Sequence, residues 1–323
     1  MSAFNEVIST KKAYLEDSYL FSMEATILSY EFANKDDFDV SLSFAKAAIE
    51  DKVDMTSPTH MDGFLILDTT CFYPQGGGQP TDEGMIKLGN DPDCSFVVKK
   101  VTINEFSQVI HSGHGNLPFW STLLSASQAT ASATEPSPEP STEPAVKKGE
   151  VCHRTVPVYL QVNEKLRMLY MRLHSTGHAL DAAMRNVGIE SSRLLGTKGY
   201  HFLDGPYVEY QLQPYQSELT VEELSTLPQL LTTELRRLVG LNILTQTDDM
   251  SRESVLEWCK EDVQGIDLSA YPDIVRMVKI CGMYIPCGGT HIRSSKEIGE
   301  EVLVTRLKKK KTAYKVSYTL AGI

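Results

Sequence analysis

Short apolar runs separated by turn-forming residues dominate the chain up to about residue 111. They occupy residues 19–21, 25–28, 64–67, 85–88 and 96–98, with Gly, Asn, Asp or Pro between them. Short apolar strands joined by polar turns are typical of a small antiparallel β-barrel. The pattern therefore predicts an N-terminal barrel, in which residues 41–50 form either a short helix or an extended insertion.

The period of the apolar positions changes after residue 163. Leu166, Leu169, Leu173 and Leu180 recur at helical spacing, and Gly188 can end the helix that they indicate. Two apolar-rich segments, residues 200–203 and 207–212, then flank an Asp-Gly pair, which is a hairpin signal. This region is therefore predicted to mix helix and strand.

The last third of the chain continues this mixture. Thr220 and Glu223 have the spacing of a capping box, which predicts a helix up to about Val239, and a further helix is expected over residues 252–262. Residues 301–320 read as a hairpin. Helices and strands without strict alternation predict an α+β fold, with helices packed on an antiparallel sheet. We expect a barrel domain over residues 1–160 and an α+β domain over residues 161–323.

A low-complexity tract interrupts the predicted barrel domain. Ser, Thr, Ala, Pro and Glu dominate residues 121–144. Such a composition buries too little apolar surface to offset the entropy lost on ordering. We predict a disordered insertion over about residues 121–146, which is either a regulatory, phospho-acceptor segment or a neutral insertion.

Charge and composition limit the classes of partner and location. The formal net charge is −11, so a nucleic acid would have to be met through a local basic patch. No stretch approaches the roughly 18 apolar residues of a membrane span, and the N-terminus lacks the layout of a signal peptide. The six cysteines show no CxxC pairing and are expected to be mostly buried thiols. We expect a cytoplasmic protein with no membrane association and no stable protein partner.

Two pairs of metal-binding side chains stand out. His174 and His178 are four residues apart on the predicted helix, so both imidazoles can face one ion. Cys287 and His291 are separated by Gly-Gly-Thr, and the glycines allow a tight turn that brings the thiolate and the imidazole together. Three nitrogens and one sulfur suit tetrahedral zinc. Either pair alone is more often a pair of ordinary polar or packed side chains than a pair of metal ligands. The two pairs together predict one Zn²⁺ site. His201 is a weaker site candidate.

A third motif, Phe-Tyr-Pro-Gln-Gly-Gly-Gly-Gln-Pro-Thr-Asp-Glu-Gly, occupies residues 72–84. Together with the two pairs, it resembles the editing domain shared by alanyl-tRNA synthetases and the free-standing AlaX proteins. The resemblance covers most of the chain, and the low-complexity tract departs from it. It implies that the zinc ligands are His174, His178, Cys287 and His291. It also implies a Gly-rich loop formed by Gly76, Gly77 and Gly78, which lies near the pocket or packs the domains together.

The resemblance implies a trans-editing hydrolase that deacylates mischarged tRNA. The expected substrates are seryl- and glycyl-tRNA(Ala), with Gln79 among the substrate-binding residues. The chain is too short to hold the aminoacylation domain as well, so we expect a stand-alone protein. Thr197 and Thr290 are candidate catalytic or pocket hydroxyls, and either can instead bond to backbone. Acceptor-end contacts are expected at a basic cluster, which a solvated hairpin tip explains equally well: Lys308, Lys309, Lys310 and Lys311.

Two other functions remain open. Four protein ligands are typical of a closed structural site, which would make the chain a non-catalytic, zinc-stabilised module that binds tRNA or protein. A metallohydrolase of small esters or amides is the other alternative. The histidine pair lacks the Glu of HExxH, which argues against a zincin-type protease. Zinc could activate a water or orient the substrate, and the sequence does not separate these roles.

Overall fold

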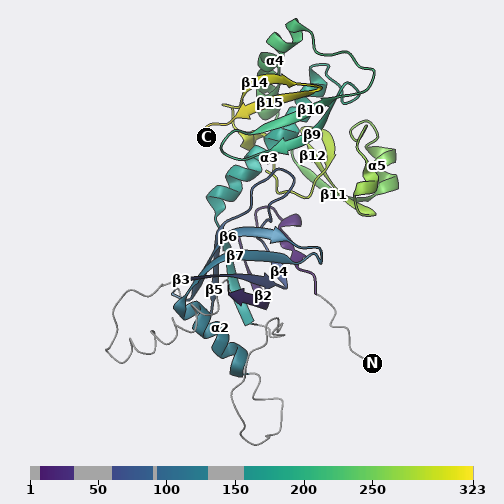
Figure 1. Cartoon of the computed structure of the whole chain (residues 1–323). Helices are drawn as coiled ribbons and strands as arrows, with labels where there is room; N and C mark the ends of the chain where they lie inside the picture. Colours follow the sequence, from purple (N-terminus) through teal and green to yellow (C-terminus); the bar gives the residue numbers. More distant parts are fainter. Residues whose placement is uncertain (1–7, 33–59, 90–92, 130–155, 323) are drawn as a thin grey trace, which may run out of the picture. The chain divides into compact units, whose positions relative to one another are not determined.

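The structure of the protein is a computed structural model that describes residues 8–32, 60–89, 93–129 and 156–322 (Figure 1). The element predicted over residues 41–50 and most of the predicted insertion lie outside these ranges. The chain divides into two compact units. One comprises Met1–Gln75 with Thr81–Glu164, and the other comprises Gly76–Pro80 with Lys165–Ile323. The Gly-rich loop therefore groups with the C-terminal unit, although barrel residues flank it on both sides.

The N-terminal unit is built on a closed antiparallel barrel with the strand order β2-β3-β7-β6-β5-β8. Its strands are β2 (Ser22–Phe32), β3 (His60–Leu67), β5 (Gly84–Leu88), β6 (Ser95–Ile103), β7 (Val109–Asn116) and β8 (Val156–Val162). A short parallel pair, β1 (Lys11–Lys12) and β4 (Thr69–Thr70), and the 3-10 turn η1 (Ala13–Leu15) complete the unit. The barrel that the apolar runs predict is confirmed.

Strict alternation of side chains fills the interior of the barrel. In β8 the apolar residues Val156, Val158, Leu160 and Val162 are buried, and the residues between them are exposed. Because successive side chains of a strand point to opposite faces, every second residue enters the core. Each fully buried Val or Leu contributes about 1.5–3 kcal/mol relative to an exposed one. The alternating pattern of the sequence thus translates directly into the barrel core.

Helix α2 (Leu117–Ala129) corrects one prediction. Residues 121–129 were expected to begin the disordered insertion, but they are helical. The apolar side chains of Phe119, Trp120 and Leu123 are fully buried, and the indole Nε1 of Trp120 donates to the carbonyl oxygen of Met61 at 3.1 Å. The composition of the tract is low in complexity on average, yet these anchors hold its first turns against the barrel core.

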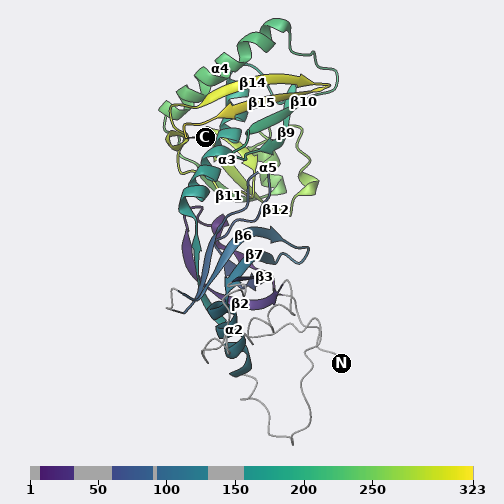
Figure 2. The same ribbon diagram turned by 60° about the vertical axis from the view of Figure 1, so that its left-hand side comes forward.

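The C-terminal unit contains a four-stranded antiparallel sheet with the order β14-β15-β10-β9. Its strands are β9 (Leu194–Tyr200), β10 (Tyr207–Leu212), β14 (Leu303–Lys310) and β15 (Ala313–Thr319). The long helices are α3 (Glu164–Asn186) and α4 (Val221–Gly240). Figure 2 shows α4 running along β14. The hairpin at the end of the chain and the α+β class are confirmed, whereas the first hairpin uses β9 as its first strand instead of the predicted residues 200–203.

The start of α4 follows the predicted capping box. The Thr220 hydroxyl accepts a hydrogen bond from the backbone N–H of Glu223, and the Glu223 carboxylate accepts one from the Thr220 N–H. The same carboxylate receives two hydrogen bonds from the guanidinium of Arg193, at 2.6 and 3.0 Å. These bonds connect the start of α4 to the residue that precedes β9.

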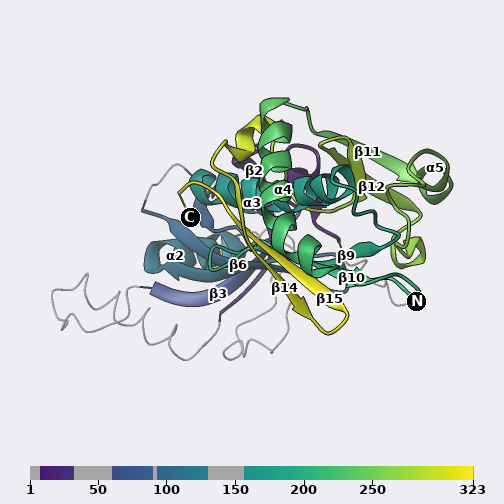
Figure 3. The same cartoon turned by 90° about the horizontal axis from the view of Figure 1, so that it is seen from above.

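A second, three-stranded sheet in this unit has the order β11-β12-β13. Its elements are β11 (Gln246–Ser251), α5 (Arg252–Trp258), η2 (Leu268–Ala270), β12 (Ile274–Ile280) and β13 (Met283–Pro286), and η3 (Ser295–Ile298) follows. Figure 3 shows α5 beside β11 and β12. Helix α5 ends four residues before the predicted end at residue 262. Within the described part of the chain, none of the helices combines the length and apolar character that crossing a membrane requires.

Candidate metal centre

Helix α3 places two imidazoles side by side. His174 and His178 are one turn apart, and their ring centroids are separated by 4.8 Å. The helix buries a long apolar face that includes Leu173, Leu180 and Met184. The histidines lie on the border of this face, so their rings are held within the unit and away from bulk solvent.

The second pair lies on a turn that follows β13. The guanidinium of Arg276 donates to the carbonyl oxygens of Cys287, at 2.6 Å, and of Gly289, at 3.1 Å. Two carbonyls gathered on one guanidinium fix the path of the turn. A side chain at Gly289 would overlap the His174 ring, whereas a methyl group at Gly288 would meet no atom within 4 Å. The second glycine is therefore required by its close approach to the helix.

The four predicted ligands converge. The ligand atoms of His174, His178, Cys287 and His291 all lie within 4.8 Å of one another. The Sγ of Cys287 is 3.5 Å from Nε2 of His174 and 3.4 Å from Nε2 of His291. Sequence spacing thus identifies four side chains from two distant segments that the fold brings to one point. The group could hold one metal ion.

An outer layer of oxygen atoms orients the three imidazoles. The Nδ1 of His174 lies 2.8 Å from Oε1 of Gln79, and the Nδ1 of His291 lies 3.2 Å from the hydroxyl of Ser175. The Nδ1 of His178 is 3.7 Å from a carboxylate oxygen of Asp181. An acceptor at Nδ1 leaves Nε2 to coordinate, which is the usual arrangement around a metal ligand.

One buried atom tests whether the group fits a metal. Nε2 of His178 is buried without a hydrogen-bond partner among the described residues. A buried polar nitrogen left unsatisfied costs about 1–3 kcal/mol. A cation at the point where the four side chains meet would satisfy this nitrogen. The donor set of one thiolate and three imidazoles also fits tetrahedral Zn²⁺.

Ionisation at the centre favours ligation. Burial opposes ionisation of the Cys287 thiol, but His174 and His291 outweigh it and hold the pKa of the thiol well below its usual range. Burial lowers the pKa of His174 and takes the pKa of His291 to about 3. Burial also works against a charged His178, yet Asp181 and Cys287 raise its pKa to about 9. A metal ion binding here competes with the proton on His178.

The Gly-rich loop reaches this centre through one side chain. The Gln79 amide is fully buried; its Nε2 donates to the hydroxyl of Thr290 at 2.7 Å, and its Oε1 accepts from the Thr290 N–H at 3.1 Å. Residues 76–79 form a tight turn in which Gly77 and Gly78 have φ values of 54° and 79°. A side chain at Gly78 would overlap the backbone of Gly199. Glycine is thus needed for both conformation and space.

Comparison with known proteins places the chain. The pattern of the family described as "tRNA synthetases class II (A)" matches residues 6–118. An "Alanyl-tRNA editing protein AlaX-L" from Pyrococcus horikoshii is 25% identical over 261 residues, which is 79% of this chain and 50% of that protein. The chain is similar in sequence to this alanyl-tRNA editing protein. An "Alanine--tRNA ligase" from Korarchaeum cryptofilum is 26% identical over 90% of the chain and 24% of the ligase. A ligase of the same name from Fervidobacterium nodosum is 26% identical over 73% of the chain and 22% of its own length.

The chain thus spans half of the length of the AlaX-L protein and under a quarter of these two ligases. The matched stretch over residues 6–118 comprises most of the barrel. The longer matches, up to 90% of the chain, cover more than the barrel alone.

The two candidate threonines of the chain have different surroundings. Thr197 in β9 is exposed, and its hydroxyl donates to the carbonyl oxygen of Glu209 in the neighbouring strand at 3.2 Å. In this structure it serves the sheet and is not brought to the metal ligands. Thr290 is fully buried and bonded to Gln79, one step from His174. The structure therefore groups only the second threonine with the centre.

The four candidate lysines of the chain lie at the tip of the last hairpin. Lys308, Lys309 and Lys310 close β14, and Lys311 begins the turn to β15, with all four exposed. Lys309 forms an ion pair with Glu218, with 2.6 Å between the Nζ and a carboxylate oxygen. The four side chains are thus available at the surface, but one of them is already paired.

His201 extends the centre beyond the four ligands. Its ring is stacked on that of His174, with centroids 4.8 Å apart and an interplanar angle of 25°. Its Nδ1 lies 2.7 Å from the Tyr318 hydroxyl, which in turn donates to the carbonyl oxygen of Leu173. Burial, followed by the charges of His174 and His178, lowers the pKa of His201 well below its usual range. Sequence reasoning had marked it only as a weak candidate.

Sequence reasoning missed Ser175 and Asp181 as outer partners of the histidines. Both lie on α3: Ser175 directly follows His174, and Asp181 lies three residues after His178. Helical spacing alone could have pointed to Asp181, because side chains three apart share a face. A bond to the distant His291 from Ser175 has no such local signal.

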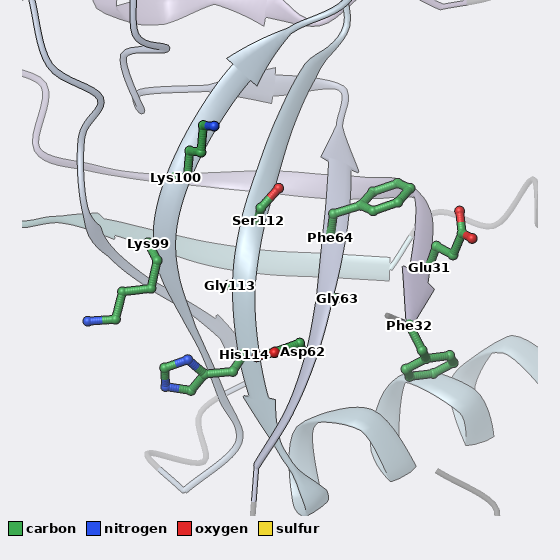
Figure 4. A pocket seen from close by; sticks show the side chains of 10 residues that line it. All are labelled: Glu31, Phe32, Asp62, Gly63, Phe64, Lys99, Lys100, Ser112, Gly113 and His114. Atoms are coloured by element: carbon green, nitrogen blue, oxygen red, sulfur yellow. The ribbon is translucent and has the colours of Figure 1, made fainter. Parts of the chain in front are cut away.

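The barrel carries a separate hollow on its outer face, with a volume of about 480 Å³. Figure 4 shows Phe64, Ser112 and Lys100 lying across adjacent strands in this hollow, with Asp62 and His114 next to them. It is open to solvent, and its acidic and basic side chains are mixed. Among the described residues, the cluster that could hold a metal ion is the one around His174, which lies in the C-terminal unit and not in this hollow. Chemistry rather than size therefore selects the four-ligand cluster as the candidate functional site.

Proposed function

We propose that this protein hydrolyses the ester between an amino acid and the terminal ribose of tRNA, with one Zn²⁺ held by His174, His178, Cys287 and His291. The main support for this proposal is that these four side chains converge on one point and that oxygen atoms around them contact the three imidazoles. The substrates proposed are seryl- and glycyl-tRNA(Ala); the names of the similar proteins support editing of alanyl-tRNA in general. The reaction belongs with translation in the cytoplasm.

In this reaction, water attacks the ester carbonyl carbon and the bond to the ribose oxygen breaks. The ribose oxygen receives a proton, which leaves a free amino acid and uncharged tRNA. When bound, the zinc ion supplies a Lewis acid that polarises an oxygen or orients the substrate. Gln79, Ser175 and Asp181 keep the three imidazoles in the orientation in which Nε2 faces the centre.

The remaining predicted residues enter this proposal in distinct roles. Gly76, Gly77 and Gly78 allow close backbone approach, and Gln79 positions a ligand. We assign Thr290 to the centre rather than Thr197, because only Thr290 lies within one hydrogen bond of a residue that touches a ligand. The lysines Lys308, Lys309, Lys310 and Lys311 are proposed to meet tRNA phosphates.

The second candidate is a zinc-stabilised binding module without catalysis. Four protein ligands around one point are the observation that favours it, since such sites are usually closed and structural. In that case zinc would join α3 to the turn after β13 and contribute folding free energy. Deacylation would then be absent although tRNA or protein binding and stability remained.

A panel of mischarged tRNAs separates the two candidates. Seryl-, glycyl- and threonyl-tRNA are compared with correctly charged alanyl-tRNA, with and without a chelator and with zinc restored. Hydrolysis of the mischarged species that stops with the chelator and returns with zinc supports the proposal. Zinc-bound, folded protein that hydrolyses none of them favours the binding module.

A further inference from the structure

Within the described part of the chain, helices cover one face of the four-stranded sheet and leave the other face to solvent. On the covered face, the Tyr210 hydroxyl donates to Asp181 of α3 at 2.7 Å, and the N–H of Val304 donates to Thr232 of α4 at 3.0 Å. Tyr210 and Val304 are buried. Because side chains alternate along a strand, their neighbours in sequence point to the opposite, solvent-facing side. Figure 1 shows the four strands of this sheet.

The open face is strongly basic. The strand register aligns Lys308 with Lys315, Lys315 with Glu209, and Glu209 with Lys198. The basic residues of this face are Lys198, Arg306, Lys308, Lys310 and Lys315, all exposed or half-buried, and Glu209 is the carboxylate within their aligned rows. A chain with a net charge of −11 thus concentrates positive charge on one sheet surface.

The same face carries a column of stacked aromatic rings. Phe202 stacks on Tyr200 with centroids 4.5 Å apart, and Tyr200 stacks on Tyr207 at 5.3 Å, both at 20° between planes. The Nζ of Lys315 lies 3.5 Å from the centroid of Tyr207. The Tyr200 hydroxyl is fixed by the carboxylate of Asp204 at 2.9 Å. Tyr200 lies between the other two rings and Tyr207 also contacts Lys315, so the half-buried Phe202 at the end of the column is the ring that retains surface for a further planar group.

The column lies next in sequence to the metal centre. His201, between Tyr200 and Phe202, turns its ring onto His174, while its two neighbours stack with each other. The N–H of His201 donates to the carbonyl oxygen of Gly78 in the Gly-rich loop at 2.9 Å. The column and the centre are therefore joined through three consecutive residues, of which His201 contacts the centre and its two neighbours form the column.

We infer that this aromatic and basic face binds single-stranded RNA, with phosphates on its lysines and a base stacked on the end of the aromatic column at Phe202. Single strands are generally held by positive charge along the backbone together with aromatic rings, which stack on any base. The inference rests on the proposed function and names its partner surface: the face takes the unpaired 3′ nucleotides of the aminoacyl-tRNA. An acidic peptide would pair with the lysines but has no planar group for the rings.

Binding of a fluorescent, single-stranded RNA dodecamer ending in CCA tests the inference, with the zinc-loaded full chain and anisotropy as the readout. Phe202→Ala and Tyr200→Ala should each weaken binding by about 10-fold to 100-fold, the effect of losing a stacked base. Phe202→Tyr should retain binding. Tyr215→Ala, which alters a fully exposed aromatic outside the column, is the matched control and should match the wild type.

Charge is tested separately on the same probe. Lys308→Gln with Lys310→Gln should reduce the slope of log Kd against log salt by about 0.7 for each phosphate that the variant no longer neutralises. Lys99→Gln in the barrel unit is the control. Zinc content, measured in every variant, separates loss of the face from loss of the centre. Polyglutamate can pair with the lysines but cannot stack on the rings. If it displaces the RNA as readily from the wild type as from Phe202→Ala, the rings add nothing to RNA binding and the stacking role is wrong.

Deacylation distinguishes the failure of this inference from failure of the proposed function. Suppose that the wild type deacylates tRNA, and that zinc-loaded Tyr200→Ala and Phe202→Ala have the wild-type Kd for RNA and the wild-type KM. The assignment of the RNA-binding face is then wrong and the proposed function stands. If RNA binding falls in both variants while no mischarged tRNA is hydrolysed by the wild type, the face stands and the proposed function is wrong.

Discussion

Oε1 of Gln79 lies 2.8 Å from Nδ1 of His174, although 95 residues separate the two in sequence. This bond connects the Gly-rich loop to the first of the four candidate ligands. It fixes the ring so that Nε2 faces the thiol of Cys287. The loop thus contributes to the centre through the orientation of a ligand, in addition to any contact with substrate.

Gln79→Ala should weaken zinc binding by about 10-fold to 100-fold, the usual effect of removing an outer partner of a metal-bound histidine. Competition with a chromophoric chelator measures the zinc affinity. Gln75→Ala, which changes an exposed glutamine of the same segment, should retain the wild-type affinity. Equal affinities in all three proteins would show that the bond does not position His174.

Gly289→Ala and Gly288→Ala form a matched pair in the turn after β13. A methyl group at Gly289 overlaps the ring of His174, whereas one at Gly288 meets open space. We expect the first variant to lose most of its bound zinc and its deacylase activity, and the second to keep both. Metal analysis of the purified proteins measures the difference. Full zinc occupancy in Gly289→Ala would contradict the tight approach of the turn to α3.

Cys287→Ala should lower zinc content and deacylation together, because it removes the thiolate from the centre. Cys281→Ala is the matched control, since Cys281 is a buried free thiol outside the cluster. Zinc content and turnover of seryl-tRNA(Ala) are measured on the same preparations. Wild-type turnover in a folded, verified zinc-free Cys287→Ala protein would disprove a catalytic role for the metal.

Glu223→Gln should destabilise the protein by about 1 kcal/mol at pH 7, the typical value of a helix cap. Hydrogen bonds from Arg193 and from the start of α4 lower the pKa of Glu223 from 4.5 to about 2. The stabilisation is therefore present above pH 4.5 and is lost as the pH falls towards 2. Urea unfolding from pH 7 down to pH 3 measures the gap between variant and wild type.

The gap should narrow as the pH falls in that series. Glu222→Gln, which changes an exposed neighbour in the same helical turn, should give a smaller difference with little dependence on pH. A Glu223→Gln gap that stays constant from pH 7 to pH 3 would show that the carboxylate and Arg193 do not couple in solution.

Leu123→Ala should destabilise the barrel unit by roughly 2–5 kcal/mol, because Leu123 is fully buried and its removal leaves a cavity. Ser125→Ala, two residues further along the exposed side of α2, should change the free energy of unfolding little. Chemical denaturation measures both. A neutral Leu123→Ala would mean that residues 121–129 do not pack on the barrel.

Local spacing predicted the barrel strands, the last hairpin and the two pairs of candidate ligands, since each strand, turn or pair depends on residues close in sequence. The i, i+4 histidines share a helical face wherever that helix packs, and Gly288 and Gly289 allow the turn between Cys287 and His291. Average composition misjudged α2, because the contribution of Leu123 depends on a barrel wall contributed by distant strands.

Long-range partners were outside the reach of such reasoning. The bonds from Gln79 to His174 and from Ser175 to His291 span 95 and 116 residues, and neither has a repeating pattern in the sequence. Thr197 had the right residue type and approximate position for a pocket hydroxyl, but the strand directs its hydroxyl to Glu209. The aromatic column likewise depends on the register of β9 with β10.

The placement of Gly76–Pro80 with the C-terminal unit means that this unit is not one continuous stretch of chain. A fragment that starts at Lys165 would contain every candidate ligand and still lack the amide that steadies the first histidine. Cutting the protein at the apparent domain border would therefore yield a weakened metal binder. A gene rearrangement that moved the later segment alone would leave Gln79 behind with the rest of Gly76–Pro80.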